Sequence, residues 1–202
     1  MLKLHYLPSA CSLADHIVLE WIGQPYEAQP VARDELRSPA FLAISPSGQV
    51  PVLEEDGWTL TENVAILNYL ADRFPASGLG GEGMRGRAEA NRWLAFLNSD
   101  VHPAFKPLFA PQRFIGDESQ HADLQQHART KLRGLFERLD AQLDGRDWLT
   151  GTRSIADPYL FVVLRWAVAK GVDLAGLDRL AAFSARLRED AGVKAAMQAE
   201  GL

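Results

Sequence analysis

"LKLHYLPSACSLADHIVLEWIG" (residues 2–23) carries the clearest signal of fold class in the chain. Its opening run, "LKLHYL", is typical of a strand, and an amphipathic helix follows the turn at once. Leu13, Ile17 and Trp21 recur every four residues on one helical face, and Gly23 is a stop signal. Cys11, the single cysteine of the chain, lies at this strand-to-helix turn.

Short segments of alternating type continue to about residue 74. "PYEAQPV" is typical of an edge strand because of its prolines. "SPAFLAIS" predicts a short helix that Ser38 opens, with Pro39 at its first position. "QVPVLEEDGWTLTE" predicts a hairpin that turns at Asp56 and Gly57, and "TENVAILNYLADRF" predicts a helix. The order βαβαββα indicates a small mixed sheet with helices packed against it.

The glycine-rich stretch "PASGLGGEGMRG" separates these segments from a part with helical periodicity only. Within that part, "PYLFVVLRWAVA" is apolar almost all round and predicts the buried helix of a bundle. We therefore predict an α/β domain over residues 1–76, a linker over 77–86 and an all-helical domain over 87–202.

Composition excludes several classes of function. With 21 basic and 26 acidic residues, the formal net charge of -5 argues against nucleic-acid binding, which needs a basic face. No apolar run approaches the ~18 residues of a membrane-spanning helix, and the first residues are too polar for a signal peptide. One cysteine cannot form an internal disulfide, so we expect a cytoplasmic protein. His121 and His127 are six residues apart, on different helical faces, and we expect no metal site.

Cys11 has two interpretations from its local sequence. Free N–H groups at a helix start favour an anion, which predicts a lowered thiol pKa, and ligands bind at the carboxyl ends of strands in α/β sheets. A small buried apolar cysteine is the alternative. Its neighbour Ser12 is either a plain N-cap or a hydroxyl that donates to a ligand thiolate.

Two further motifs each have a structural and a ligand-binding interpretation. Pro51 after Val50 is either an ordinary trans proline of an edge strand or a cis proline that leaves the Val50 backbone free to pair with an extended peptide. Glu62 and Asn63 are either a first-turn acid and a cap, or an acceptor for an ammonium beside a helix start that favours a carboxylate. Those two groups form the head of a free amino acid.

Together with "FLAISPSGQVPVLEEDG", "LTENVAILNYLAD", "SIADPYLFVVLRWA" and the final "AEGL", these motifs make the whole chain resemble the cytosolic glutathione transferases, and most closely their bacterial beta type. The resemblance implies a thioredoxin-like N-terminal domain, an all-helical C-terminal domain and a homodimer. Glutathione would be the co-substrate, with no other cofactor, and a small hydrophobic electrophile would bind between the domains.

The resemblance also implies roles for residues of the first domain. Cys11 would lie against the glutathione sulfur and be able to form a mixed disulfide with it, with Ser12 supporting conjugation. Val50, before a cis Pro51, would pair with the cysteinyl backbone. Glu62 and Asn63 match the residues that hold the γ-glutamyl ammonium and carboxylate.

From the helical domain, His102 in "SDVHPAF" matches a histidine that approaches the sulfur. The pattern often has Lys directly after it, where this chain has Pro103; either Lys106, one turn on, replaces that lysine or the contact is missing. The glycyl carboxylate would meet Arg33, Arg37 or neither. Relatives often have Asn where this chain has Ala95, which removes a ligand contact there.

Phe105, Phe109 and Trp166 are candidates for the hydrophobic pocket and equally good core residues. "RSIADPYL" matches the family's folding motif, in which Ser154 and Asp157 form a capping box with a structural role.

The resemblance predicts a glutathione S-transferase that conjugates glutathione to electrophiles, with thiol-disulfide exchange through Cys11 as a second activity. Two alternatives stand beside it. One is a non-catalytic binding or regulatory protein on the same scaffold, and the other is an enzyme that is mainly a thiol-disulfide oxidoreductase.

Overall fold

The first part of the chain forms one four-stranded mixed sheet in a computed structural model that describes residues 1–202. The strands are β1 (Leu2–Tyr6), β2 (Tyr26–Pro30), β3 (Val52–Glu55) and β4 (Trp58–Thr61), in the order β2-β1-β3-β4. β2 pairs with β1 in parallel, whereas β3 is antiparallel to both β1 and β4. β2 lies at an edge, as its prolines predict.

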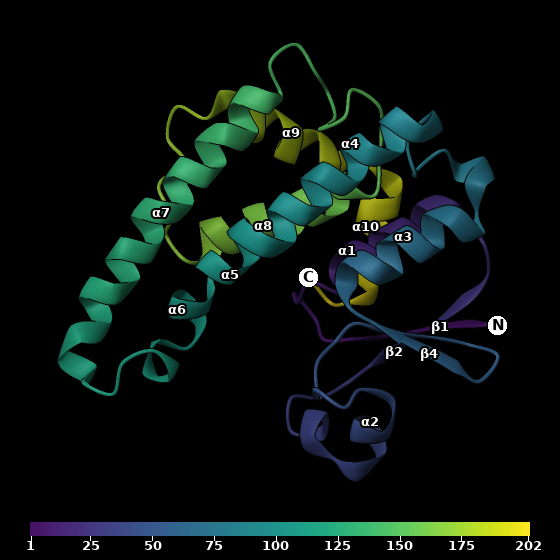
Figure 1. The fold of residues 1–202 in the computed structure, drawn as a ribbon, viewed down its shortest axis with the longest axis horizontal. Coiled ribbons are helices and arrows are strands. Elements are labelled where there is room, and N and C mark those ends of the chain that lie inside the picture. The colour runs from purple at the N-terminus through teal and green to yellow at the C-terminus, as the bar shows by residue number, and fades with distance from the viewer.

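Helices cover both faces of this sheet, with α1 (Leu13–Ile22) and α3 (Asn63–Arg73) on one side and α2 (Pro39–Ile44) on the other (Figure 1). α1 ends at Gly23, which has φ of 70° and takes the left-handed conformation that glycine adopts readily. α2 begins after Ser38, whose Oγ accepts from the Phe41 amide over 3.2 Å. The predicted order βαβαββα and the thioredoxin-like domain are confirmed.

Beyond this domain the chain is helical, as predicted, and no helix combines the length and apolar character needed to cross a membrane. Its elements are α4 (Gly83–Phe96), the π-helical segment η3 (Leu97–Val101), α5 (His102–Ala104), α6 (Lys106–Phe109), α7 (His121–Gln142), α8 (Ala156–Ala169), α9 (Asp178–Glu189) and α10 (Ala191–Ala199). Four short 3₁₀ turns connect elements: η1 (Glu35–Arg37), η2 (Pro75–Ser77), η4 (Pro111–Arg113) and η5 (Glu118–Gln120). α4 begins inside the stretch predicted as a linker over 77–86.

α8 is the buried helix of the bundle, and its start has the Asp157 half of the predicted capping box, whereas Ile155 directly precedes the helix in place of Ser154 and makes no side-chain capping bond. Asp157 Oδ2 accepts from the Ser154 amide over 2.7 Å, while Ser154 Oγ accepts from the Ala156 amide over 3.3 Å. The other Asp157 oxygen, Oδ1, accepts from the Leu149 amide over 2.9 Å and so ties the preceding loop to the helix.

The two domains share one apolar core, in which α1 packs against α8 and α10. Ile17 of α1, Tyr159 of α8 and Val193 of α10 have no exposed surface. Burying a side chain such as Ile17 contributes roughly 1.5–3 kcal/mol. This packing fixes the end of β1 and the start of α1 against the helical domain, and the site forms there.

Candidate functional site

The loop between β1 and α1 is held from both sides by the helical domain. Its residue Ser9 has φ of 64°, an uncommon conformation for a non-glycine residue. Glu200 Oε2 accepts from the Ser9 amide over 3.1 Å, and the indole N–H of Trp166 donates to the Ser9 carbonyl over 2.8 Å. The buried His16 Nδ1 is 3.0 Å from the other Glu200 oxygen. The final turn of the chain therefore positions the loop that presents Cys11.

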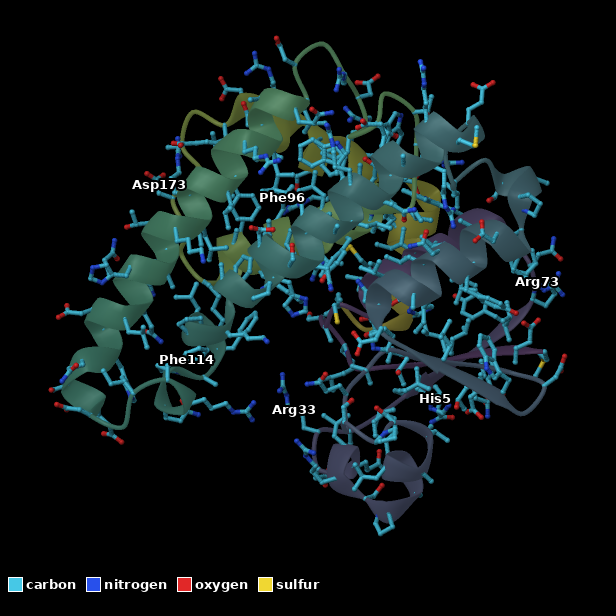
Figure 2. The ribbon with its side chains drawn as sticks, in the orientation of Figure 1. His5, Arg33, Arg73, Phe96, Phe114 and Asp173 are labelled. Atoms are coloured by element: carbon cyan, nitrogen blue, oxygen red, sulfur yellow. The ribbon has the colours of Figure 1, made fainter.

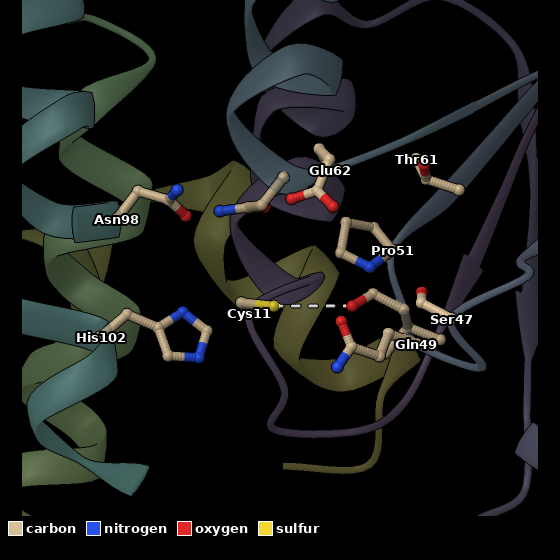
Figure 3. A pocket seen from close by; sticks show the side chains of 10 residues that line it. Cys11, Ser47, Gln49, Pro51, Thr61, Glu62, Asn98 and His102 are labelled. Atoms are coloured by element: carbon tan, nitrogen blue, oxygen red, sulfur yellow. Dashed lines mark hydrogen bonds between the residues drawn. The ribbon is translucent and has the colours of Figure 1, made fainter.

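Cys11 is half-buried at the carboxyl end of β1, where its Sγ–H donates to the Val50 carbonyl over 3.7 Å (Figure 3). The pKa of the Cys11 thiol is raised to about 12, first by burial and then by the negative charge of Asp15. The backbone N–H groups of Cys11 and Ser12 oppose this rise only in part. The predicted lowering of the thiol pKa is therefore wrong, because desolvation outweighs the oriented amides at this helix start.

Ser12 is fully buried, and its hydroxyl lies within the loop. Its Oγ accepts from the Leu7 amide over 3.3 Å and is 3.4 Å from the Leu7 carbonyl, to which it donates. It makes no capping hydrogen bond to α1. The Ser12 hydroxyl therefore stabilises the loop between β1 and α1, and its contact with a ligand stays a prediction.

The Val50–Pro51 peptide bond is cis, which decides between the two interpretations of that motif. β3 begins only at Val52, and the Val50 amide makes no hydrogen bond within the protein. Val50 thus offers a free N–H, and a carbonyl that only the Cys11 thiol contacts. An extended peptide can therefore pair with the N–H and the carbonyl of Val50 as it would with a neighbouring strand.

Glu62 and Asn63 stand where β4 ends and α3 begins. Glu62 is exposed and has φ of 75°, a strained conformation that costs roughly 1–3 kcal/mol and is typical of functional sites. Asn63 is buried, and neither its amide oxygen nor its amide nitrogen has a hydrogen-bond partner. An acidic side chain and an unpaired amide therefore flank the amino end of α3, which favours anions.

The helical domain supplies His102, together with two residues that the sequence did not single out. The Tyr159 hydroxyl donates to Asn98 Oδ1 over 3.2 Å and is 2.7 Å from His102 Nδ1. Because that hydroxyl has one proton, His102 Nδ1 is the donor in their contact and its Nε2 is left as an acceptor. The pKa of His102 is lowered to about 4, first by burial and then by the Lys106 charge, so the ring is neutral at pH 7.

Asn98 lies in η3, the π-helical segment that leads into His102. π-helical segments are rare in proteins as a whole, and those that occur often lie at functional sites. Their sequences carry no simple signature. The sequence predicted that an amide contact is lost at Ala95. Asn98, three residues further on, has a side-chain amide that lines the same pocket as His102.

These groups enclose a polar pocket in which Asn98 and His102 face Cys11 from the helical domain and Glu62, Thr61, Pro51 and Gln49 lie on the other side (Figure 3). The lining residues are Cys11, Ser47, Gln49, Val50, Pro51, Thr61, Glu62, Asn63, Asn98 and His102. The predicted glutathione contacts at Val50, Pro51, Glu62 and Asn63 thus come together around the thiol. Ser47, Gln49 and Thr61 are lining residues that sequence reasoning missed.

A second cavity, of about 510 Å³ and with mainly apolar walls, adjoins the polar pocket and shares Cys11 and His102 with it. Trp166 and Phe109 line it, as predicted for the hydrophobic pocket. Phe105 is fully buried behind them, with its ring 5.8 Å from that of Phe109 between centroids. Phe105 therefore supports the wall and does not line the cavity.

The cationic candidates are spread over different places. Arg33 is exposed and lines the apolar cavity, pointing toward the helical domain (Figure 2). Arg37 donates to the Ser47 carbonyl at the edge of the polar pocket over 3.3 Å. Lys106 is exposed and lines neither pocket, and its replacement of the missing lysine stays a prediction. Lys170, which the sequence did not indicate, lines the apolar cavity with its Nζ 5.2 Å from the Phe109 ring centroid.

Comparisons with known proteins agree with this geometry. A model of the glutathione S-transferase N-terminal domain matches residues 13–78, and one of the glutathione S-transferase C-terminal domain matches residues 96–190. The chain is 53% identical over 203 residues to glutathione S-transferase GST-4.5 of Xanthomonas campestris pv. campestris, with 100% of each chain covered.

Two solved structures are similar over 99% of both chains. One is a sphingomonad glutathione S-transferase complexed with glutathione, with a TM-score of 0.87 and 40% identity. The other is a bacterial beta class glutathione S-transferase from Sphingomonas chungbukensis, with a TM-score of 0.87 and 36% identity.

Proposed function

The chain belongs to the glutathione S-transferase family, and from this premise we propose that it conjugates glutathione to small hydrophobic electrophiles. The observation that carries the proposal is the shared wall of the two pockets. A polar pocket with peptide-binding groups and an apolar cavity meet at Cys11 and His102. A nucleophile held in the first is therefore presented to a molecule held in the second.

Glutathione lies in extended form along the polar pocket in this proposal. Its cysteinyl backbone pairs with the free amide and the carbonyl of Val50. The γ-glutamyl ammonium meets the Glu62 carboxylate, and the γ-glutamyl carboxylate lies at the amino end of α3 beside Asn63. A sphingomonad relative of the same fold has been solved with glutathione bound, which supports this assignment.

The glutathione sulfur then lies against Cys11 and is the attacking nucleophile. Because Cys11 keeps its proton at neutral pH, it donates an S–H hydrogen bond to the glutathione thiolate and stabilises it. His102 Nε2 faces the same region as an acceptor for a thiol proton. The thiolate forms a new bond to the electrophilic carbon, and the leaving group departs with its electron pair.

The electrophile occupies the apolar cavity between the domains, where Trp166 and Phe109 provide aromatic walls. Their rings are in edge-to-face contact, with centroids 5.4 Å apart. Phe109 is 45% exposed, so a flat apolar ligand can cover it and remove that surface from water.

We further propose a homodimer, a cytoplasmic location and a role in detoxification. Trp58 of β4 is 47% exposed and Met84 of α4 is 92% exposed, and a second copy of the chain would cover such apolar surface. A single free thiol and a thiol co-substrate suit a reducing compartment.

Calorimetry with glutathione tests the binding step. The wild-type protein should bind glutathione, and Glu62→Gln should weaken binding tenfold or more, because a charge-assisted hydrogen bond to the ammonium is worth about 1.5–3 kcal/mol. Glu27→Gln is a matched control, since Glu27 pairs with Lys3 on the sheet away from the pocket. An absence of binding by the wild-type protein would refute the proposal and favour a non-catalytic relative with another ligand.

Substitutions at the thiol separate conjugation from disulfide exchange. Wild type, Cys11→Ala and Ser12→Ala should be compared on a model aryl halide and on a glutathione mixed disulfide. We expect aryl-halide conjugation to dominate in wild type and to fall in Cys11→Ala through loss of the S–H donor. Dominant reduction of the mixed disulfide, abolished in Cys11→Ala, would show that the protein is mainly an oxidoreductase.

A further inference from the structure

Asp15 is a buried carboxyl group without any hydrogen-bond partner. Its side chain lies in the first turn of α1 and has no exposed surface. Neither Oδ1 nor Oδ2 is bonded to a donor, in contrast to the buried Asp157, whose two oxygens accept three hydrogen bonds. A buried acid that does not stabilise the fold through hydrogen bonds calls for a chemical role.

Asp15 lies one turn after Cys11, and its negative charge acts on the Cys11 thiol. The Cys11 carbonyl accepts from the Ala14 amide over 2.9 Å in the turn that leads into α1. The Ser12 carbonyl accepts from the His16 amide over 3.0 Å, which is the four-residue spacing of an α-helix. In a helix, the four-residue spacing of Cys11 and Asp15 corresponds to roughly 5–6 Å between Cβ atoms.

No cation compensates a charge on Asp15 from the elements packed on α1. Glu200, at the end of α10, is a second acid whose charge adds to the effect of burial and raises the pKa of Asp15 well above its usual value. His16 already pairs with Glu200. The Tyr159 hydroxyl of α8 lies near both Asp15 and Cys11, and Glu62 adds a further negative charge near Cys11.

We propose that Asp15 adds to the effect of burial in keeping Cys11 in its thiol form and thereby shifts the site toward conjugation and away from disulfide exchange. The two groups are neighbours at the start of α1, where a negative charge on Asp15 opposes the formation of a second one on the Cys11 sulfur. This inference rests on the proposed function and identifies the residue that sets the balance between its two chemistries.

The two reactions place different demands on Cys11. In conjugation its S–H bond stays intact and serves as a hydrogen-bond donor to the glutathione thiolate. In exchange the Cys11 thiolate attacks a sulfur of a glutathione mixed disulfide, and a new Cys11–glutathione disulfide forms. The old disulfide bond breaks, the departing thiolate takes up a proton, and the substrate is reduced as Cys11 is oxidised. Only the second reaction requires the thiolate that Asp15 suppresses.

The test is the pH dependence of Cys11 alkylation by iodoacetamide, without glutathione. Cys11 is the only cysteine, so the incorporated label reports on this thiol alone. Removing a unit charge about 6 Å away at an effective dielectric constant of about 20 should lower the midpoint by roughly one to two pH units in Asp15→Asn and Asp15→Ala. Alkylation at pH 7.5 should become about ten- to a hundredfold faster in both variants.

Glu20→Gln is the matched control, because it removes an acidic charge from the same helix at a residue that contacts Tyr26 instead. Circular dichroism establishes that each variant is folded. Unchanged midpoints in the folded variants would overturn the proposal. So would a wild-type midpoint at or below the ~8.5 of a free cysteine, a measurement that needs no variant.

A second measurement follows the balance of activities. The ratio of mixed-disulfide reduction to aryl-halide conjugation should rise at least tenfold in Asp15→Asn, and an unchanged ratio would contradict the proposal. Glutathione binding is measured separately by calorimetry. Binding without any shift in alkylation refutes the role of Asp15 alone, whereas absence of binding refutes the proposed function.

Discussion

Asp157→Ala removes the group that organises the start of the buried helix α8. Its carboxylate accepts hydrogen bonds from the Leu149 amide at 2.9 Å, the Ser154 amide at 2.7 Å and the Ser154 hydroxyl at 2.9 Å. Asp157 and Ser154 have no exposed surface. The substitution therefore leaves three donors without an acceptor in a place that water does not reach in the native protein.

Each unsatisfied buried donor costs about 1–3 kcal/mol. Three of them give roughly 3–9 kcal/mol, and the upper part of this range is reduced because water can enter the space left by the carboxyl group. We expect a loss of about 3–5 kcal/mol in the free energy of unfolding. A protein of this kind has about 5–15 kcal/mol in all, so the variant should still fold at low temperature. Asp157→Asn, which keeps one acceptor oxygen, should lose less.

Guanidinium unfolding followed by tryptophan fluorescence, at one fixed protein concentration, measures the loss. Asp72→Ala is the control, because Asp72 is 72% exposed in its ion pair with Arg87 and should contribute at most about 1 kcal/mol. A loss below about 1 kcal/mol for Asp157→Ala, similar to that of the control, would refute the reasoning. That result would show that water replaces the Asp157 carboxylate as hydrogen-bond acceptor with no net loss in the free energy of unfolding.

Four further predictions concern the helical side of the site. The pKa of His102 is lowered to about 4 in the folded protein, below the usual 6.5. The contribution of neutral His102 to stability is therefore present above pH 6.5 and is lost as pH falls through about 4. An NMR titration that found His102 protonated at pH 6 would contradict this prediction. Lys106→Met should raise that pKa, because the lysine charge is one of the two causes that lower it. Phe109→Ala should raise KM for a hydrophobic electrophile severalfold and leave the glutathione Kd unchanged, since Phe109 lines only the apolar cavity; equal effects on both constants would place the electrophile elsewhere. Tyr159→Phe should lower conjugation by loss of the hydroxyl that orients His102, with the glutathione Kd again unchanged in calorimetry.

Local sequence signals predicted the elements of the fold because each depends on a few neighbouring residues. The Asp56–Gly57 turn, the Ser38 cap and the Gly23 stop each act within about four residues of their own position, and all three are found in the structure. The contact between the Ser154 amide and the Asp157 carboxylate is equally local. Even the strained Glu62 lies where the sequence placed the boundary between β4 and α3.

The protonation state of the Cys11 thiol depends on the folded environment and not on its sequence neighbours alone. The sequence placed Cys11 at a helix start and left a lowered pKa and a buried apolar thiol equally open, but the folded surroundings of Cys11 raise its pKa to about 12. Desolvation depends on everything that surrounds a group, and here it includes Tyr159 of α8, more than 140 residues away in sequence. The link from Tyr159 to His102 and Asn98 spans 57 and 61 residues in the same way, and no periodicity in the sequence could reveal it. Local sequence was enough to predict which residues stand at the ends of strands and helices, whereas packing determined which of them meet and which protons they keep.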